Sequence, residues 1–223
     1  MNNFATRFLL CALAAVPASA QNPPADTSFV LPGAFSERTT VTDLENLFGK
    51  SNVRVIEAQS DDGARGRSVV LFPDDPTRRA YVDFHDNQAL EGVRSISVKD
   101  AGSRWRGKRG VLVGMSFAEL RRLNGKPFWF SGFDSQHRGW AQDLWSPAGE
   151  NDDGELGALD VEEGEHMYFG VDLGLRSQAK DISDDAWPHD ESVSSDDPRY
   201  PRLGELVEVT AINATTSLDD EWQ

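Results

Sequence analysis

One serine of this 223-residue chain lies in a context similar to a nucleophile elbow. In the segment Val113–Ala118, Ser116 follows a short apolar run and opens a helical pattern, as the reactive serine of Gly-x-Ser-x-Gly hydrolases does. Ala118 stands where that motif requires its second glycine. Thr40 occupies the equivalent place in a second copy of the pattern, and both Ser and Thr are favoured helix N-caps. We therefore expect Ser116 to cap a helix.

Metal-ligand patterns are weak. The four histidines lie far apart with no His-Glu-x-x-His motif, which argues against a zinc hydrolase; they are His85, His137, His166 and His189. The segment Gly149–Glu155 approaches the spacing of an EF-hand loop, but Gly149 stands at the position of the first acidic ligand. An acidic turn is the expectation there and calcium the alternative. We predict no metal site and no cofactor.

Paired carboxylates are the remaining catalytic option. Asp143 and Asp172 could act as general acid and base in a secreted or periplasmic hydrolase of envelope polymers. With 37 acidic residues in the chain, no pair is specific. The predicted function is therefore non-catalytic binding of a protein or other ligand, as an enzyme inhibitor or an envelope factor, and the hydrolase is the alternative.

The binding surface is predicted from strand alternation. A helix covers only one face of a four-stranded antiparallel sheet, so the other face is polar or holds a partner. In the strand that starts at His166, the alternate residues Met167, Phe169, Val171 and Leu173 are all apolar and belong to the core. The outward residues form the predicted binding set: Tyr81, His85, Trp129, Phe133, Trp145, His166 and Tyr168. Cover by an acidic loop, or ordinary packing, is the alternative for these aromatics.

A duplicated element positions these residues. The segment 40–50 is echoed by 116–126 at an interval of 76 residues, and each copy carries an N-cap, an acidic residue three positions later and a terminal glycine. Each copy is followed by segments that read as strands: 53–57, 67–72, 80–84 and 93–98 in the first unit, and 128–133, 139–145, 166–173 and 205–212 in the second. The predicted fold class is α+β, with two tandem repeats that each pack a capped helix on a four-stranded antiparallel sheet.

The predicted domain boundaries follow from these repeats. Residues 1–20 are a signal peptide and 21–37 a polar, loosely held lead-in. The first repeat spans 38–100, a basic linker 101–110, and the second repeat 111–223 with an acidic loop at 176–203. The linker contains Arg104–Arg109, which could bind the acidic tail or an anionic partner, although internal ion pairs are the simpler account.

Export and charge limit the possible partners. An apolar run at 8–16 precedes the small residues Ala18-Ser19-Ala20, as in a secretory signal, and Cys11 within it is the only cysteine. We expect a periplasmic or secreted bacterial protein with no membrane insertion. The net charge is −15, and residues 150–223 alone carry −17. Such acidity argues against nucleic acid as a partner. The partner is an unidentified protein or small ligand, and the oligomeric state is not defined.

The tandem helix-plus-sheet pattern resembles the secreted β-lactamase inhibitor protein family. Its single unit, with the signature Gly-x-Ser/Thr-x-x-x-Leu-x-x-x-x-Gly-x-Pro, is similar to small outer-membrane assembly lipoproteins. The second copy matches at Gly114–Leu120 and Gly125–Pro127, whereas Arg38 and Ser51 depart from the signature in the first. The resemblance spans 38 to about 175 and implies binding through aromatics on an exposed sheet face. It carries over no individual contact residue, and the inhibitors' disulfides are absent.

Overall fold

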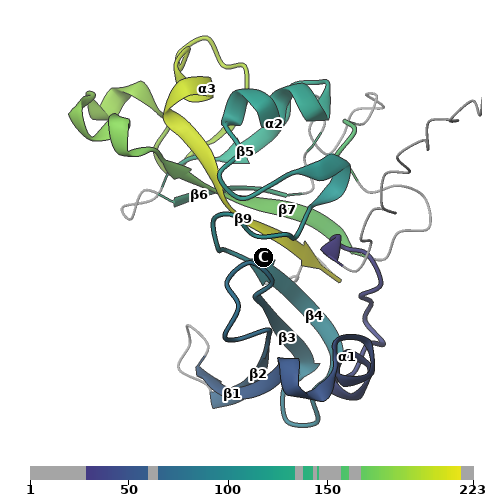
Figure 1. Cartoon of the computed structure of the whole chain (residues 1–223). Helices are drawn as coiled ribbons and strands as arrows, with labels where there is room; N and C mark the ends of the chain where they lie inside the picture. Colours follow the sequence, from purple (N-terminus) through teal and green to yellow (C-terminus); the bar gives the residue numbers. More distant parts are fainter. Residues whose placement is uncertain are drawn as a thin grey trace, which may run out of the picture.

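A single antiparallel sheet dominates the computed structural model, which describes residues 29–59, 65–133, 138–142, 145, 157–160 and 167–216 (Figure 1). Its strands follow the order β1-β2-β3-β4-β9-β7-β6-β5-β8, and every neighbouring pair is antiparallel. The strands are β1 (Val53–Gln59), β2 (Arg65–Leu71), β3 (Ala80–Asp86), β4 (Glu91–Val98), β5 (Trp129–Ser131), β6 (Arg138–Gln142), β7 (Tyr168–Leu175), β8 (Ser192–Ser194) and β9 (Val207–Thr215). The fold is therefore α+β or mainly β.

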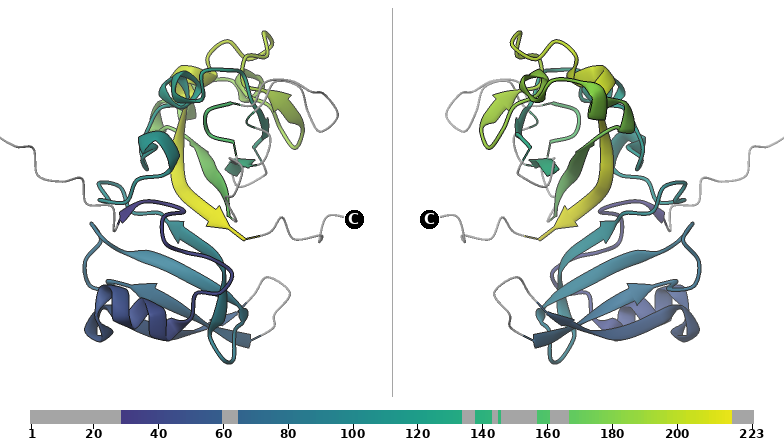
Figure 2. Two further views of the ribbon diagram at one scale, coloured as in Figure 1. Left: turned by 90° about the vertical axis from the view of Figure 1, so that its right-hand side faces the viewer. Right: turned by 90° about the vertical axis from the view of Figure 1, so that its left-hand side faces the viewer.

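The prediction of two separate four-stranded sheets differs from this structure. Strand β4 pairs with β9, with Ser95 opposite Thr215 and Val98 opposite Ile212. The two halves meet along this pair, as the side views in Figure 2 show. Two open strand edges would leave rows of unpaired backbone groups, and pairing them with each other satisfies both. One continuous sheet is the result.

The two capped helices are confirmed. Helix α1 (Val41–Phe48) begins after Thr40 and α2 (Phe117–Asn124) after Ser116. The Ser116 hydroxyl accepts the Glu119 N–H at 3.2 Å, and the Glu119 carboxylate accepts the Ser116 N–H at 3.1 Å. This reciprocal pair is a capping box, and α1 has the same pair. Ser116 is thus committed to a structural role.

Both helices end at the predicted glycines. Gly49 and Gly125 have positive φ angles of 86° and 75°, and their N–H groups donate to Glu45 and Arg121 carbonyls. Glycine adopts such angles without a side-chain clash. A third, short helix, α3 (Leu203–Leu206), contacts α2. None of the described helices is long and apolar enough to cross a membrane.

The predicted acidic loop at 176–203 is wrong in part, because it contains regular structure. Short 3-10 helices span Ser177–Asp181 and Asp184–Ala186, and β8 then pairs with β5 at the sheet edge. Val193 of β8 is opposite Phe130 and is buried. A three-residue strand bounded by Ser and Asp gives no alternation long enough to detect in sequence.

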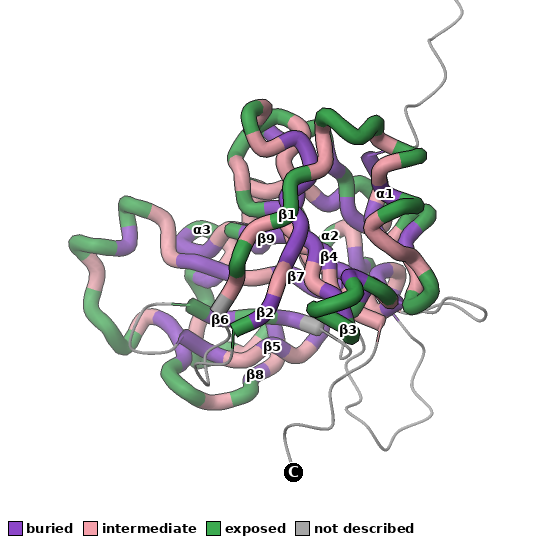
Figure 3. Tube along the Cα trace, turned by 90° about the horizontal axis from the view of Figure 1, so that it is seen from below, coloured by how far each residue is buried: buried purple, intermediate pink, exposed green. Residues whose placement is uncertain are grey.

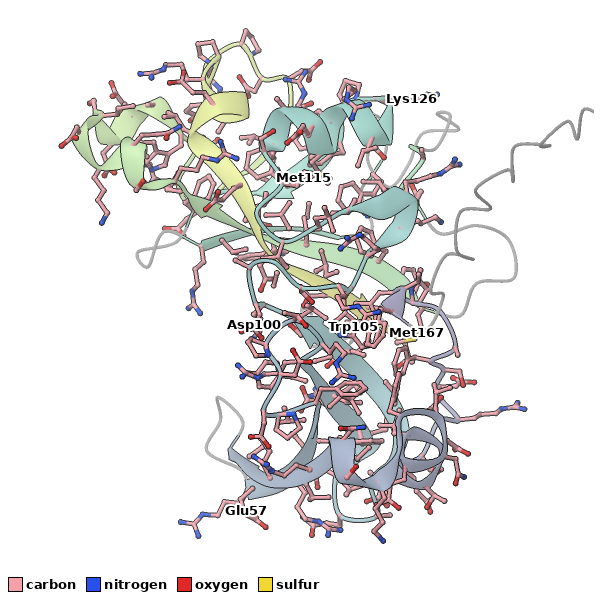
Figure 4. All side chains as sticks on the ribbon, viewed as in Figure 1. Glu57, Asp100, Trp105, Met115, Lys126 and Met167 are labelled. Atoms are coloured by element: carbon pink, nitrogen blue, oxygen red, sulfur yellow. The ribbon has the colours of Figure 1, made fainter. Side chains whose placement is uncertain are left out.

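The described part of the lead-in, residues 29–37, and the linker also differ from the prediction, because both contribute to the core. Phe29 and Leu31 exchange backbone hydrogen bonds with Arg106, at 2.9 and 2.8 Å. Trp105 is fully buried, and its indole N–H donates to the Arg78 carbonyl at 2.7 Å. Figure 4 shows Trp105 where the two halves of the sheet meet. Because Trp105 stands among basic residues in the sequence, the segment was predicted to be an exposed linker and not part of the core.

The core lies between the helices and one face of the sheet (Figure 3). One set of aromatic rings packs under α1 and another under α2, with centroids 4.9 to 6.1 Å apart. The first comprises Phe29, Phe35, Phe48, Phe72 and Trp105, and the second Phe117, Phe128, Phe130, Trp145 and Phe169. Apart from Val70 and Ala211, the described buried apolar residues belong to one connected core, and the partly buried Phe48 packs against it.

Candidate binding face

Helices α1 and α2 lie on one side of the sheet (Figure 2), and the side chains on the opposite side form what we call the outer face. Alternation places these side chains between core residues along the central strands. In β3, for example, Ala80, Val82 and Phe84 are buried, whereas Tyr81 and Asp83 are not. The outer face comprises Ser68, Val70, Tyr81, Asp83, Ser95, Ser97, Asn213, Thr215, Tyr168, Asp172 and Trp140.

The sheet register sets these residues in rows. Asp83 is opposite Ser95, Ser95 opposite Thr215, and Thr215 opposite Tyr168, so one row crosses four strands. The β4–β9 pair lies in the middle of the row. Residues from both halves of the chain therefore contribute to one surface.

Trp140 is the most exposed aromatic residue of this surface. Its side chain is 47% exposed, although exposed large apolar side chains are usually costly to leave in water. It lies in β6 directly opposite Asp172 of β7. On the far side of the face, the Lys99 ammonium lies 5.9 Å from the centre of the Tyr81 ring. Aromatic and charged groups thus lie together on the face of the sheet opposite α1 and α2.

Asp172 lies between β6 and β9 on the outer face and is largely shielded from water. Burial raises the pKa of its carboxyl group, and three influences oppose that rise: a hydrogen bond from Asn213 and the positive charges of Lys99 and Arg138. The Asn213 amide donates to Asp172 at 2.8 Å. A shielded carboxylate next to an exposed indole can pair with a cation or donate a proton.

Asp83 anchors a hydroxyl network on the other half of the face. It accepts hydrogen bonds from Ser68 at 2.5 Å and from Ser95 at 3.3 Å. These partners hold the carboxylate in place, so the surface around it is ordered before any ligand arrives. Preorganisation of this kind lowers the entropic cost of binding.

Four of the predicted binding residues lie on the outer side of the sheet. Tyr81 and Tyr168 are half-buried within the outer face, and Trp129 is half-buried in β5 opposite Ser194. His85 is exposed near the end of β3, where its Nε2 lies 2.8 Å from the Thr216 hydroxyl. Tyr81 and Tyr168 come from different halves of the chain and are joined through the same sheet.

The prediction that Phe133 and Trp145 belong to the binding surface is wrong, because both side chains are fully buried. Strand β5 ends at Ser131, so its alternation does not extend to Phe133, whose N–H instead donates to the Pro188 carbonyl. The Trp145 ring stacks on Phe169, and its indole N–H donates to the Phe169 carbonyl at 2.9 Å. Both rings belong to the core.

Trp140 was missed by the prediction. It stands between Gly139 and Ala141, which are both buried, and that alternation was the available signal. Trp140 and Trp145 were expected to face opposite sides of one strand, and which of them points outward depends on where β6 ends. The strand ends at Gln142, before Trp145.

Several other candidates fall outside the described residues: the signal at 1–20, His137, Asp143, the calcium-like segment 149–155 and His166. Within the described ranges, no group of three or more His, Cys, Asp or Glu side chains could hold a metal ion.

The chain was compared with protein-family models, curated proteins and solved structures, and none of them matches it. The arguments for function therefore come from this chain alone.

Proposed function

We propose that this protein is an exported, non-catalytic binding protein that engages a protein or other ligand through its outer face. The observation that carries the proposal is the half-exposed Trp140 ring, which lies in register with Asp172 on the face opposite α1 and α2. Tyr, Trp and charged side chains that cluster on one surface are typical of binding sites.

We further propose that the chain is a duplication of one helix-plus-sheet module. One copy is α1 with β1 to β4, and the other is α2 with β5, β6, β7 and β9. The matched capping boxes support it, as does the strand order, in which the last strand of each copy lies at the centre. Under this proposal the resemblance to the β-lactamase inhibitor protein family concerns the module and the exposed face.

A site-specific photocrosslinking experiment tests the binding role. A benzoylphenylalanine at position 140 is expected to form discrete adducts in periplasm or medium, and the adducts should be lost when Tyr168→Ala is combined with it. The matched control places the same probe at Leu47, an exposed apolar residue of α1 that is 53% exposed. Equal adducts at positions 140 and 47 would contradict the proposal.

The hydrolase of envelope polymers remains a second candidate, because burial raises the pKa of Asp172 as a general acid requires. Its test is release of soluble fragments from dye-labelled cell-wall polymer. The hydrolase predicts release by the wild type and none by Asp172→Asn. The binding role predicts no release by either protein.

A further inference from the structure

A cavity of about 480 Å³ lies beside the sheet where β7 ends and β9 begins. Its lining comes from the start of β6, from the end of β7 and from the segment 176–187 that follows β7. This volume is within the range of small-molecule sites, roughly 300 to 1,000 Å³. Apart from Arg138, whose charge also acts on Asp172, its lining residues have no part in the outer-face proposal.

The wall of the cavity is apolar. Leu173 is fully buried, Trp187 is 4% exposed, and Ile182 packs against the same core. An indole ring and two branched side chains suit the flat or chain-like body of an organic ligand. Apolar surface removed from water there stabilises a complex by about 25 cal/mol per Å².

The charges around this wall are mostly positive. Arg138, Arg176 and Lys180 line the cavity, with Asp184 as the acidic member. Residues 150–223 contain only four basic residues, and two of these four, Arg176 and Lys180, lie here. The Arg176 guanidinium is held by Glu208, with Nε 3.1 Å from the carboxylate. A cationic lining in the most acidic part of the chain favours an anionic ligand group.

An unpaired donor provides an independent observation. The Trp187 indole N–H is buried and has no hydrogen-bond acceptor among the described residues. A buried donor without a partner costs roughly 1 to 3 kcal/mol, so native proteins usually supply an acceptor. Trp187 is one of the lining residues, so this unsatisfied donor belongs to the wall of the cavity.

We propose that the cavity binds a small amphipathic anion. Its apolar body would pack against Leu173, Ile182 and Trp187. Its carboxylate, sulfonate or phosphate group would lie near Arg138 and Lys180.

The test uses 8-anilinonaphthalene-1-sulfonate, whose aromatic rings and single anionic group match this description. We expect saturable binding with a one-to-one ratio, measured by fluorescence titration of the mature protein. N-phenyl-1-naphthylamine, which lacks the sulfonate, should bind at least about fivefold more weakly, because one charge interaction at the protein surface is worth on the order of 1 kcal/mol. Equal binding of the two probes would overturn the proposal.

Charge-reversal variants locate the site. Lys180→Glu and Arg138→Glu should each raise the dissociation constant of the sulfonate probe by about fivefold or more. Arg202→Glu is the matched control, because Arg202 pairs with Glu205 outside the cavity and its reversal changes the net charge equally. An equal loss in the control would show a general charge effect and would exclude the site.

Two further variants separate this proposal from the outer-face proposal. Thr210→Trp, at the exposed rim, should block the cavity and abolish probe binding, with an unchanged melting temperature as the check on folding. Trp140→Ala should leave probe binding unchanged. If Trp140→Ala abolishes binding and Thr210→Trp does not, the probe occupies the outer face, and the cavity proposal is wrong.

Discussion

The pKa of the Asp172 carboxyl group depends on the burial and the charges of the surface around it. It is shielded by its neighbours, although it lies on the face opposite the core. A single Asn213 hydrogen bond does not replace the full hydration shell of a carboxylate. The neutral carboxylic acid is therefore stabilised relative to the charged carboxylate. The folded state thus binds a proton at Asp172 more readily than the unfolded chain does.

This raised pKa predicts an effect of pH on stability with a definite sign. The contribution of Asp172 is fully present below the pKa of the unfolded chain, near 3.8, and is lost as the pH rises through the folded pKa. Asp172→Asn imitates the protonated form. We therefore expect the variant to melt at a higher temperature than the wild type at pH 7 and at the same temperature at pH 3, measured by circular dichroism.

Asp86 provides the opposite control. Backbone N–H groups of Ala89 and Gln88 lower the pKa of Asp86, so its contribution is present at neutral pH and is lost as the pH falls through its folded pKa. Asp86→Asn should therefore melt lower than the wild type at pH 7. A lower melting temperature for Asp172→Asn at pH 7 would show that the Asn213 hydrogen bond and the nearby positive charges outweigh the cost of burying the carboxylate.

At the scale of elements, the sequence predicted individual helices and strands better than it predicted which strands pair. The helices α1 and α2 were predicted from a cap, an acidic residue and a glycine, because each of these acts within one or two turns. Eight of the strands were predicted from alternation or composition. The pairing of β4 with β9 was not predicted, because paired residues that lie 114 to 120 positions apart share no local sequence signal. Trp145 and Phe133 were misplaced for a related reason, since their strands end before them.

The duplicated caps allow an exchange between the two helices. Ser116→Ala and Thr40→Ala should each lower the free energy of unfolding by about 1 kcal/mol, because each exposes a helix N-terminal N–H. Ser116→Thr and Thr40→Ser, which place each cap in the other helix, should cost less than about half of that. Urea denaturation measures the difference. An Ala variant as stable as the wild type would contradict the capping role.

At the scale of the whole molecule, the linker connects the two halves through a close contact. Gly107 lies directly against the Phe169 ring of β7, so that a Cβ at position 107 would lie 2.3 Å from the nearest ring atom. The Gly107 N–H donates to Val111, which holds this part of the linker in place. With β4 paired to β9 and one connected core, the two halves should unfold together.

A double-mutant cycle at this contact tests that coupling. Gly107→Ala should lower the free energy of unfolding by about 1 to 3 kcal/mol, because the methyl group overpacks the ring. Phe169→Leu should cost a similar amount through the cavity that it leaves. The double variant should lose clearly less than the sum, because the smaller side chain makes room for the methyl group. Tryptophan fluorescence and far-UV circular dichroism should give coincident urea transitions in each protein. Additive losses would show that Gly107 and Phe169 are not in contact, and separate transitions would show that the halves fold independently despite their shared sheet.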